Sequence, residues 1–196
     1  MTDDREQLVR EIVEHTDRVL VPPYDPAIMA GQGTAALELL EDVPSLDVLL
    51  TPVGGGGLMA GCSTVTRALF PGVQVFGVET DSANDTYLSL RRGERVTIPP
   101  PPTIADGIRA TTPGALTFPI LKRNLTDVLL VGDAEVRAAV RFLLQRARMV
   151  VEPTGAVAAA ALLSGRLSLA QGARVGVVLS GGNIEPDLLI EILRGI

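Results

Sequence analysis

A chain of 196 residues with 46% hydrophobic side chains is long enough to bury the core of one domain or slightly more. No apolar run approaches the ~18 residues of a membrane span, and no leading apolar segment has the pattern of a signal peptide, so we expect a cytoplasmic protein without a membrane partner. A net charge of -6, the lack of a basic patch and an aromatic content of 3% argue against a nucleic-acid partner, and the single cysteine, Cys62, excludes an intrachain disulfide.

The beginning of the chain predicts two helices separated by an extended segment. Apolar residues recur at helical spacing over residues 2–16. A short strand is expected over 19–21, and the prolines that follow it predict a turn and a first domain boundary. The second helix is expected over 28–40, where Gly31 and Gly33 predict either a bend or the close approach of another backbone.

The remainder of the chain alternates between short apolar runs and helical patterns. The strands are expected over 48–53, 73–78, 127–131, 150–151 and 174–179, and the helices over 58–69, 83–92, 115–124, 133–149, 156–163 and 186–193. Helical connections between strands are typical of parallel pairing. We therefore predict an α/β fold class, with three layers and a mostly parallel sheet covered by helices on both faces.

Four consecutive glycines, Gly54 to Gly57, separate the first of these apolar strands from its helix. Without Cβ atoms this backbone can turn tightly and aim several N–H groups at one point, which lies at the start of the helix 58–69. Orphan amides and the helix dipole favour a phosphate monoester there. A flexible linker is disfavoured because both flanks are strongly apolar. The glycines therefore predict a phosphate-binding turn.

One interpretation of this turn is a dinucleotide site. Gly55, Gly57 and Ala60 satisfy the G-x-G-x-x-G/A fingerprint. Glu79 lies 19 residues after Ala60, where a ribose-binding carboxylate is expected. From these residues alone, an NAD-binding domain is a fair hypothesis.

Further polar residues follow other predicted strands. They are the segments 152–154 and 180–183, together with Glu79 and Asp85. Ligands of parallel sheets bind at the carboxyl ends of the strands. We therefore expect these residues at the same edge of the sheet as the glycine turn.

Five motifs, taken in order, resemble threonine ammonia-lyase (threonine dehydratase) and serine racemase, which are fold-type II pyridoxal phosphate enzymes with a tryptophan synthase beta-like fold. The motifs are Gly31-Gln32-Gly33-Thr34, Pro52-Val53-Gly54-Gly55-Gly56-Gly57-Leu58, Ile104-Ala105-Asp106-Gly107, Glu152-Pro153-Thr154-Gly155 and Leu179-Ser180-Gly181-Gly182-Asn183. The ordered set spans the chain and moves the dinucleotide interpretation to second place. It implies the tail of a small domain over 1–25 and the large cofactor-binding domain over 26–196.

The resemblance also implies a cofactor, pyridoxal 5'-phosphate, and the residues that bind it. The cofactor-binding residues that it implies are Gly54, Gly55, Gly56 and Gly57 for the phosphate, Gly107 and Glu152 along the ring, and Ser180, followed by Gly181, at the pyridine nitrogen. A Mg²⁺ or Ca²⁺ site is implied at Glu79, Asp85 and the carbonyl of Ala83. A solvated helix start is an equally good interpretation of these two carboxylates.

The family's Schiff-base lysine is expected in a Ser-Phe-Lys-like motif ahead of the glycine turn, and a Ser-Gly-Asn-His motif is expected there as well; neither occurs in this sequence. The single lysine, Lys122, follows the turn and is interpreted as an exposed helix residue, so we predict no catalytic residue. The resemblance implies an ammonia-lyase acting on L-threonine or L-serine, present here as a C-terminal portion that is inactive alone and self-associates or needs a missing segment. The alternative is a non-catalytic phosphate-ligand binding module or partner subunit.

Overall fold

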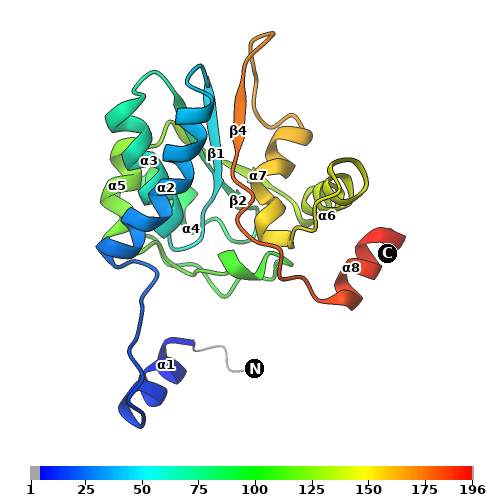
Figure 1. The fold of residues 1–196 in the computed structure, drawn as a ribbon. Helices are drawn as coiled ribbons and strands as arrows, with labels where there is room; N and C mark the ends of the chain where they lie inside the picture. Colours follow the sequence, from blue (N-terminus) through cyan, green and yellow to red (C-terminus); the bar gives the residue numbers. More distant parts are fainter. Residues whose placement is uncertain (1–4, 196) are drawn as a thin grey trace.

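The computed structural model describes residues 5–195, and within them four strands form one sheet. The strands are β1 (Val48–Pro52), β2 (Gln74–Thr80), β3 (Asp127–Val131) and β4 (Val175–Val177). They lie in the order β3-β2-β1-β4, and each neighbouring pair is parallel. The carboxyl ends of all four strands therefore meet at one edge, which is the lower edge in Figure 1.

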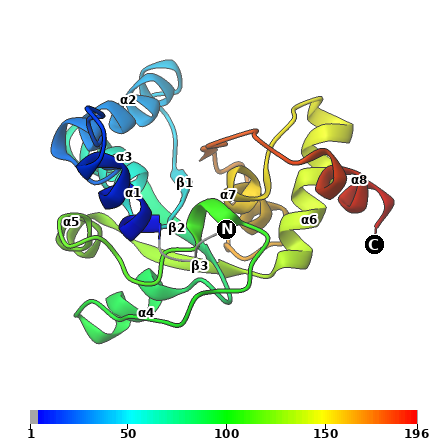
Figure 2. The ribbon, with the colours of Figure 1, turned by 90° about the horizontal axis from the view of Figure 1, so that it is seen from below.

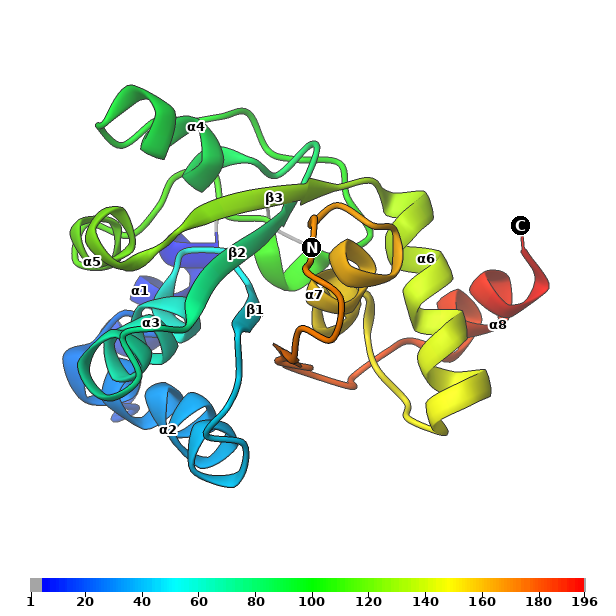
Figure 3. The same ribbon diagram turned by 90° about the horizontal axis from the view of Figure 1, so that it is seen from above.

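Helices cover both faces of this sheet, as Figure 3 shows from above. The helices are α1 (Arg5–Glu14), α2 (Pro26–Asp42), α3 (Gly57–Leu69), α4 (Asp85–Arg92), α5 (Thr117–Asn124), α6 (Asp133–Phe142), α7 (Pro153–Leu163) and α8 (Pro186–Arg194), with a 3-10 turn η1 (Asp106–Ile108) and a π turn η2 (Leu143–Ala147). The layer of α2, α3 and α5 lies on one face, and that of α6, α7 and α8 on the other. The predicted three-layer α/β fold is confirmed.

Alternate residues of β1 supply the core on both sides of the sheet. Leu49 is fully buried in a cluster with Leu40 and Cys62 on the α2 and α3 side. Leu50 is fully buried in the opposite cluster, where it joins Val157 of α7. Both faces of the strand are thus buried from solvent, which is why the sequence shows a continuous apolar run rather than an alternating one. Among residues 5–195, no helix is both long and apolar enough to cross a bilayer.

Two predicted strands do not form. Residues 19–21 are irregular, and the side chain of Val19 is 87% exposed. Proline cannot donate a hydrogen bond to a sheet, so the following Pro22 and Pro23 disfavour pairing of this segment. Residues 150–151 are also irregular. In both places the apolar character of the short run misled the prediction. The predicted domain boundary at residue 25 stays a prediction.

The helix that was expected to reach residue 149 ends earlier. α6 stops at Phe142 and continues as the π turn η2, and Arg148 then takes a left-handed φ of 60°. This wider turn redirects the chain toward α7. The strand expected over 174–179 is likewise short, with only the residues of β4 in strand conformation.

Neither Gly31 nor Gly33 bends α2, which runs without a break from Pro26 to Asp42, and Gly33 allows a close helix contact. A Cβ on Gly33 would lie 3.0 Å from the carbonyl oxygen of Gly61 in α3. A Cβ on Gly61 would overlap the carbonyl oxygen of Met29. The backbones of α2 and α3 therefore touch, and the close approach predicted for this motif is confirmed.

We expect Gly61→Ala to lower the free energy of unfolding by at least about 2 kcal/mol, because its new methyl group meets main-chain atoms that cannot move aside independently. Gly31→Ala is the matched control, since no atom lies within 4 Å of the position of its Cβ. That substitution should stabilise the chain by about 0.5–1 kcal/mol through helix propensity. Urea unfolding of both variants tests this, and equal stability of the two would contradict the helix contact.

Candidate functional site

Gly56 turns the chain from β1 into α3. Its φ of 93° lies in the left-handed region, and it is the N-cap of the helix. The first intrahelical hydrogen bond runs from Ala60 N to Gly56 O at 2.8 Å. The amides of Gly57, Leu58 and Met59 precede that bond and have no partner within the helix. Together with the helix dipole they form a group of donors suited to an anion.

The aromatic ring of Tyr24 and the backbone of Pro23 explain why two of these positions must be glycine. A Cβ on Gly55 would overlap the hydroxyl and ring of Tyr24. A Cβ on Gly57 would overlap the carbonyl oxygen of Pro23. The extended segment before α2 thus packs directly on the glycine turn, and a side chain at Gly55 or Gly57 would displace it.

Hydrogen bonds hold the other side of the turn. The carbonyl oxygen of Gly55 accepts from Thr117 Oγ1 at 2.6 Å and from Gly114 N at 3.1 Å. A Cβ on Gly54 would lie 3.1 Å from Ile108 Cα. The turn is therefore held by protein contacts on both sides.

A cavity of about 200 Å³ opens beside this turn, at the carboxyl ends of the strands. It is lined by Pro23, Tyr24, Gln32, Pro52, Gly54, Gly55, Gly56, Gly57, Leu58, Gly107, Ile108, Thr154 and Ser180. Figure 2 views the molecule from this side, with η1 in front of the sheet. Of the residues expected to bind a cofactor, the four glycines, Gly107 and Ser180 thus surround one space.

Glu152 and Gly181 stand behind this lining and connect its loops. Glu152 N donates to Gly181 O at 3.1 Å, and Glu152 Oε2 accepts from Asn183 N at 2.9 Å. Thr154 Oγ1 accepts from Gly107 N at 2.9 Å. The loops after η2, after β4 and around η1 are therefore joined by hydrogen bonds, although they lie far apart in the sequence.

The carboxylates of Glu79 and Asp85 are both fully buried, so their interpretation as a solvated helix start is wrong. Glu79 Oε1 accepts from Thr86 N at 3.0 Å, and Glu79 Oε2 accepts from Tyr87 N at 2.8 Å. This carboxylate thus caps the start of α4. Both of its oxygens are therefore occupied by amides of α4, and Glu79 does not line the cavity beside the glycine turn, which argues against its binding a ribose there.

Burial raises the pKa of Glu79 well above its ordinary value, and the neighbouring Asp85 raises it further. Burial also raises the pKa of Asp85, to about 7. Both carboxylate oxygens of Asp85 are buried without a hydrogen-bond partner in the described structure. Two adjacent buried carboxyl groups need a proton or a cation to offset their repulsion. Within residues 5–195, no three His, Cys, Asp or Glu side chains gather where they could hold a metal ion.

The profile of the protein family described as pyridoxal-phosphate dependent enzyme matches residues 1–181 of this chain. The chain belongs to this family. The L-threo-3-hydroxyaspartate ammonia-lyase of Pseudomonas sp is 44% identical over 196 residues, which are all of this chain and 61% of that protein. The serine racemase of Schizosaccharomyces pombe is 42% identical over 93% of this chain and 57% of its own length. The chain thus spans about three fifths of these relatives.

A solved structure of the family has the same fold. The serine racemase of maize superposes with a TM-score of 0.87 and is 33% identical, over 100% of this chain and 60% of that one. The resemblance to fold-type II pyridoxal phosphate enzymes is therefore confirmed. Membership of this family also supports pyridoxal phosphate as the cofactor.

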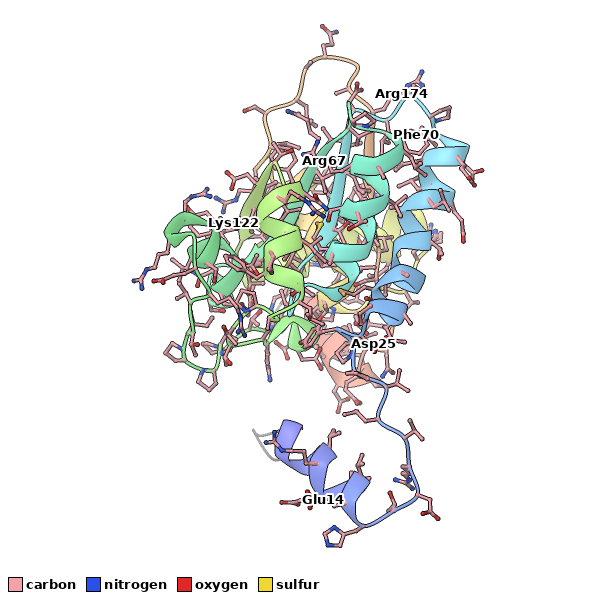
Figure 4. The ribbon with its side chains drawn as sticks, turned by 90° about the vertical axis from the view of Figure 1, so that its left-hand side faces the viewer. Glu14, Asp25, Arg67, Phe70, Lys122 and Arg174 are labelled. Atoms are coloured by element: carbon pink, nitrogen blue, oxygen red, sulfur yellow. The ribbon has the colours of Figure 1, made fainter. Side chains whose placement is uncertain are left out.

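Lys122 is not among the residues that line the cavity. Its Nζ donates to the carbonyl oxygen of Gly93 at 2.8 Å, where Gly93 ends α4 in a left-handed conformation. Figure 4 shows Lys122 on α5, above Asp25, the N-cap of α2. Lys122 is exposed, so its interpretation as an exposed helix residue is confirmed.

Sequence reasoning missed two polar residues of the cavity. Tyr24 was interpreted as part of a turn, and Gln32 as part of a helix contact. Both line the cavity, as does Thr154, which was expected at this edge of the sheet. For Gln32 the signal was available, since it lies inside a motif shared with the family. For Tyr24 the signal was weak, because it depends on a contact with a glycine 31 residues later.

The thiol of Cys62, in α3, should be inert in the folded chain. It is fully buried, and burial raises its pKa to about 11. The thiolate, which is the reactive form, is therefore scarce at pH 8. We expect iodoacetamide at pH 8 to leave Cys62 unmodified, as measured by mass spectrometry, and to alkylate it after unfolding in guanidinium chloride. Equal rates in both states would contradict this environment.

Proposed function

We propose that the protein is a pyridoxal phosphate-dependent ammonia-lyase that acts on L-threonine or L-serine. Its overall reaction converts the hydroxylated amino acid into a 2-oxo acid and ammonia. The observation that carries the proposal is the rigid glycine turn at the start of α3, which opens on a cavity of about 200 Å³ in a chain of this family. Relatives named for L-threo-3-hydroxyaspartate make that amino acid a further candidate substrate. Because the chain spans 61% of the first of these relatives, the proposal concerns the whole protein.

The residues of the cavity fit the phosphate group of pyridoxal phosphate. Side chains are absent at the turn, and the amides of Gly57, Leu58 and Met59 remain available to phosphate oxygens. When bound, the cofactor withdraws electrons from the Cα atom of the amino acid attached to it. The turn would hold the cofactor by its phosphate, and Gly107 and Ser180, which line the same cavity, would be available to its ring.

Ser180 is proposed to hydrogen-bond the pyridine nitrogen. A neutral hydroxyl does not favour protonation of this nitrogen as a carboxylate does, which limits electron withdrawal into the ring and suits β-elimination. Glu152 is proposed to flank the ring, where its bonds to Asn183 N and Gly181 O hold its position. The loops that carry the two residues are joined by the hydrogen bond from Glu152 N to Gly181 O, which supports their acting together on the ring.

The base that removes the Cα proton is proposed to be a lysine amine that these 196 residues do not provide. Lys122 is the single lysine, and its amine is bound to the end of α4. The same observation supports the second candidate function, a phosphate-ligand binding module or partner subunit whose site is completed by a lysine from another polypeptide. Co-purification with a lysine-bearing protein would favour this second function.

Pyridoxal phosphate should stabilise the purified chain against heat, because a ligand that binds the folded state alone shifts the unfolding equilibrium. At about 100 times its Kd the gain is about 2.7 kcal/mol. We expect a much smaller effect from pyridoxal, which lacks the phosphate, and none from NAD. Thermal melts with all three ligands test this.

Stabilisation by NAD but not by pyridoxal phosphate would overturn the proposed function. The chain alone should also release no 2-oxobutanoate from threonine. If it does, the proposal that the base comes from elsewhere fails while the cofactor assignment stands.

We also propose a divalent cation, Mg²⁺ or Ca²⁺, between Glu79, Asp85 and the carbonyl of Ala83. The two oxygens of Asp85 that lack hydrogen bonds in the described structure support it, because hard cations prefer oxygen ligands. None of these three residues lines the cofactor cavity. The cation would therefore serve the stability of the β2–α4 connection and would not contact the substrate.

Millimolar Mg²⁺ or Ca²⁺ should raise the melting temperature of the wild-type chain at pH 8, which lies above the pKa of about 7 of Asp85. Asp85→Asn should remove this response, because the amide cannot balance a cation's charge. Asp187→Asn, at an exposed position of α8, is the matched control and should keep it. A melting temperature that is unchanged by cations and by EDTA would contradict the proposal.

A further inference from the structure

The motif Gly31-Gln32-Gly33 places a glutamine beside the phosphate turn. Gly33 lets α2 contact α3 at Gly61, which brings the first half of α2 level with the start of α3. The thiol of Cys62 donates to the carbonyl oxygen of Gln32 at 3.6 Å and fixes this register. As a result, the side chain of Gln32 lines the cofactor cavity.

The carboxamide of Gln32 lies against the first residue of α3. Its Oε1 is 2.9 Å from the position that a Cβ on Gly57 would take. This oxygen is buried and has no hydrogen-bond partner in the described structure. A buried polar atom without a partner is costly in a folded protein, so its presence at a ligand cavity calls for a role.

The other polar side chains of the cavity have partners or roles. Thr154 Oγ1 is bonded to Gly107 N, and the Tyr24 ring is packed on Gly55. Ser180 is assigned above to the pyridine nitrogen. Among the polar side chains that line the cavity, Gln32 is therefore the one without an assigned role.

The charge of the lining makes such a donor valuable. Among the described residues, those around the cavity include no Lys, Arg or His. A phosphate dianion held there must be bound by neutral groups, namely main-chain amides, the dipole of α3 and side-chain donors. A carboxamide is a neutral group that supplies two N–H donors.

We propose that the Gln32 carboxamide is a further ligand of the cofactor phosphate. Rotation of the amide about its Cγ–Cδ bond exchanges Oε1 and Nε2, and brings an N–H donor to the place next to Gly57 where a phosphate oxygen would lie. The donor adds to the amides of the first turn of α3 without adding charge. This inference rests on the proposed function and extends it by one side chain that binds a phosphate monoester.

Two variants separate binding of phosphate from packing on Gly57. Gln32→Met keeps the length of the side chain and removes both donors. Gln32→Glu keeps its shape and places a carboxylate beside the dianion. Gln171→Glu makes the same change of charge on the exposed loop before β4, at the opposite edge of the sheet, and is the matched control.

The measurement is the Kd of each purified chain for pyridoxal phosphate, pyridoxal and inorganic phosphate, from thermal melts at several ligand concentrations. We expect Gln32→Met to weaken pyridoxal phosphate about tenfold, as loss of a hydrogen bond to a charged group does. Gln32→Glu should weaken it further, and both variants should leave the Kd for pyridoxal unchanged. Gln171→Glu should match the wild type.

The outcomes distinguish this inference from the function on which it rests. If the wild type binds pyridoxal phosphate and Gln32→Met binds it equally well, the side chain only packs on Gly57 and the inference fails alone. If Gln32→Met weakens pyridoxal as much as pyridoxal phosphate, the effect is structural and the inference also fails. If the wild type binds neither pyridoxal phosphate nor phosphate, the proposed function and this inference fail together. Should Gln32→Glu not fold, Gln32→Met alone decides.

Discussion

The absence of Cβ atoms along Gly54 to Gly57 is the constraint on which the rest of the structure depends. Each glycine meets a different neighbour, among them the ring of Tyr24 and the carbonyl of Pro23. The neighbours of Gly54, Gly55 and Gly57 include main-chain atoms or the Tyr24 ring, and those of Gly56 are the packed side chains of Thr117 and Leu121, so an added side chain would meet atoms at all four positions. The turn consequently serves two purposes at once: it exposes the first amides of α3 to the cavity, and it seats the segment that leads into α2. The same requirement recurs where Gly61 lets α2 lie on α3.

The N-termini of α3 and α4 differ in how their unpaired main-chain amides are used. At the glycine turn, main-chain N–H donors and the dipole of α3 favour a negatively charged ligand, in a cavity whose described lining lacks cationic side chains. At the start of α4, the carboxyl groups are the protein's own. Glu79 accepts hydrogen bonds from two main-chain amides, and Asp85 is buried beside it. The first arrangement leaves the amides of the helix terminus available to an anion. In the second, Glu79 bonds the amides of the helix terminus, and the charge of the adjacent Asp85 has no such partner.

The sequence predicted the layers, the parallel sheet and the glycine turn because each depends on local pattern: apolar runs, helical spacing and consecutive glycines. The predictions were wrong where strand formation depends on hydrogen-bonded pairing with a neighbouring strand. Residues 19–21 have strand-like composition, but they remain exposed because the prolines that follow cannot donate to a neighbouring strand. The predictions also missed Tyr24 in the cavity, since the packing of a side chain on Gly55 follows from the fold and not from the neighbouring residues. The π turn after Phe142 left no trace in the helical pattern that precedes it.

The described lining of the cavity has no cationic side chain that would attract an anion and raise its association rate. The chain carries a net charge of -6, so its long-range field repels a phosphate monoester until the ligand is within reach of the α3 amides. Added salt screens that repulsion but acts weakly on partly buried dipoles at short range. For a phosphate monoester bound as proposed, moderate ionic strength would therefore accelerate association and change dissociation little, which is the reverse of the behaviour of a site built from lysine and arginine. The long-range field of the chain would oppose association, while the short-range field of the α3 amides would favour retention of the ligand.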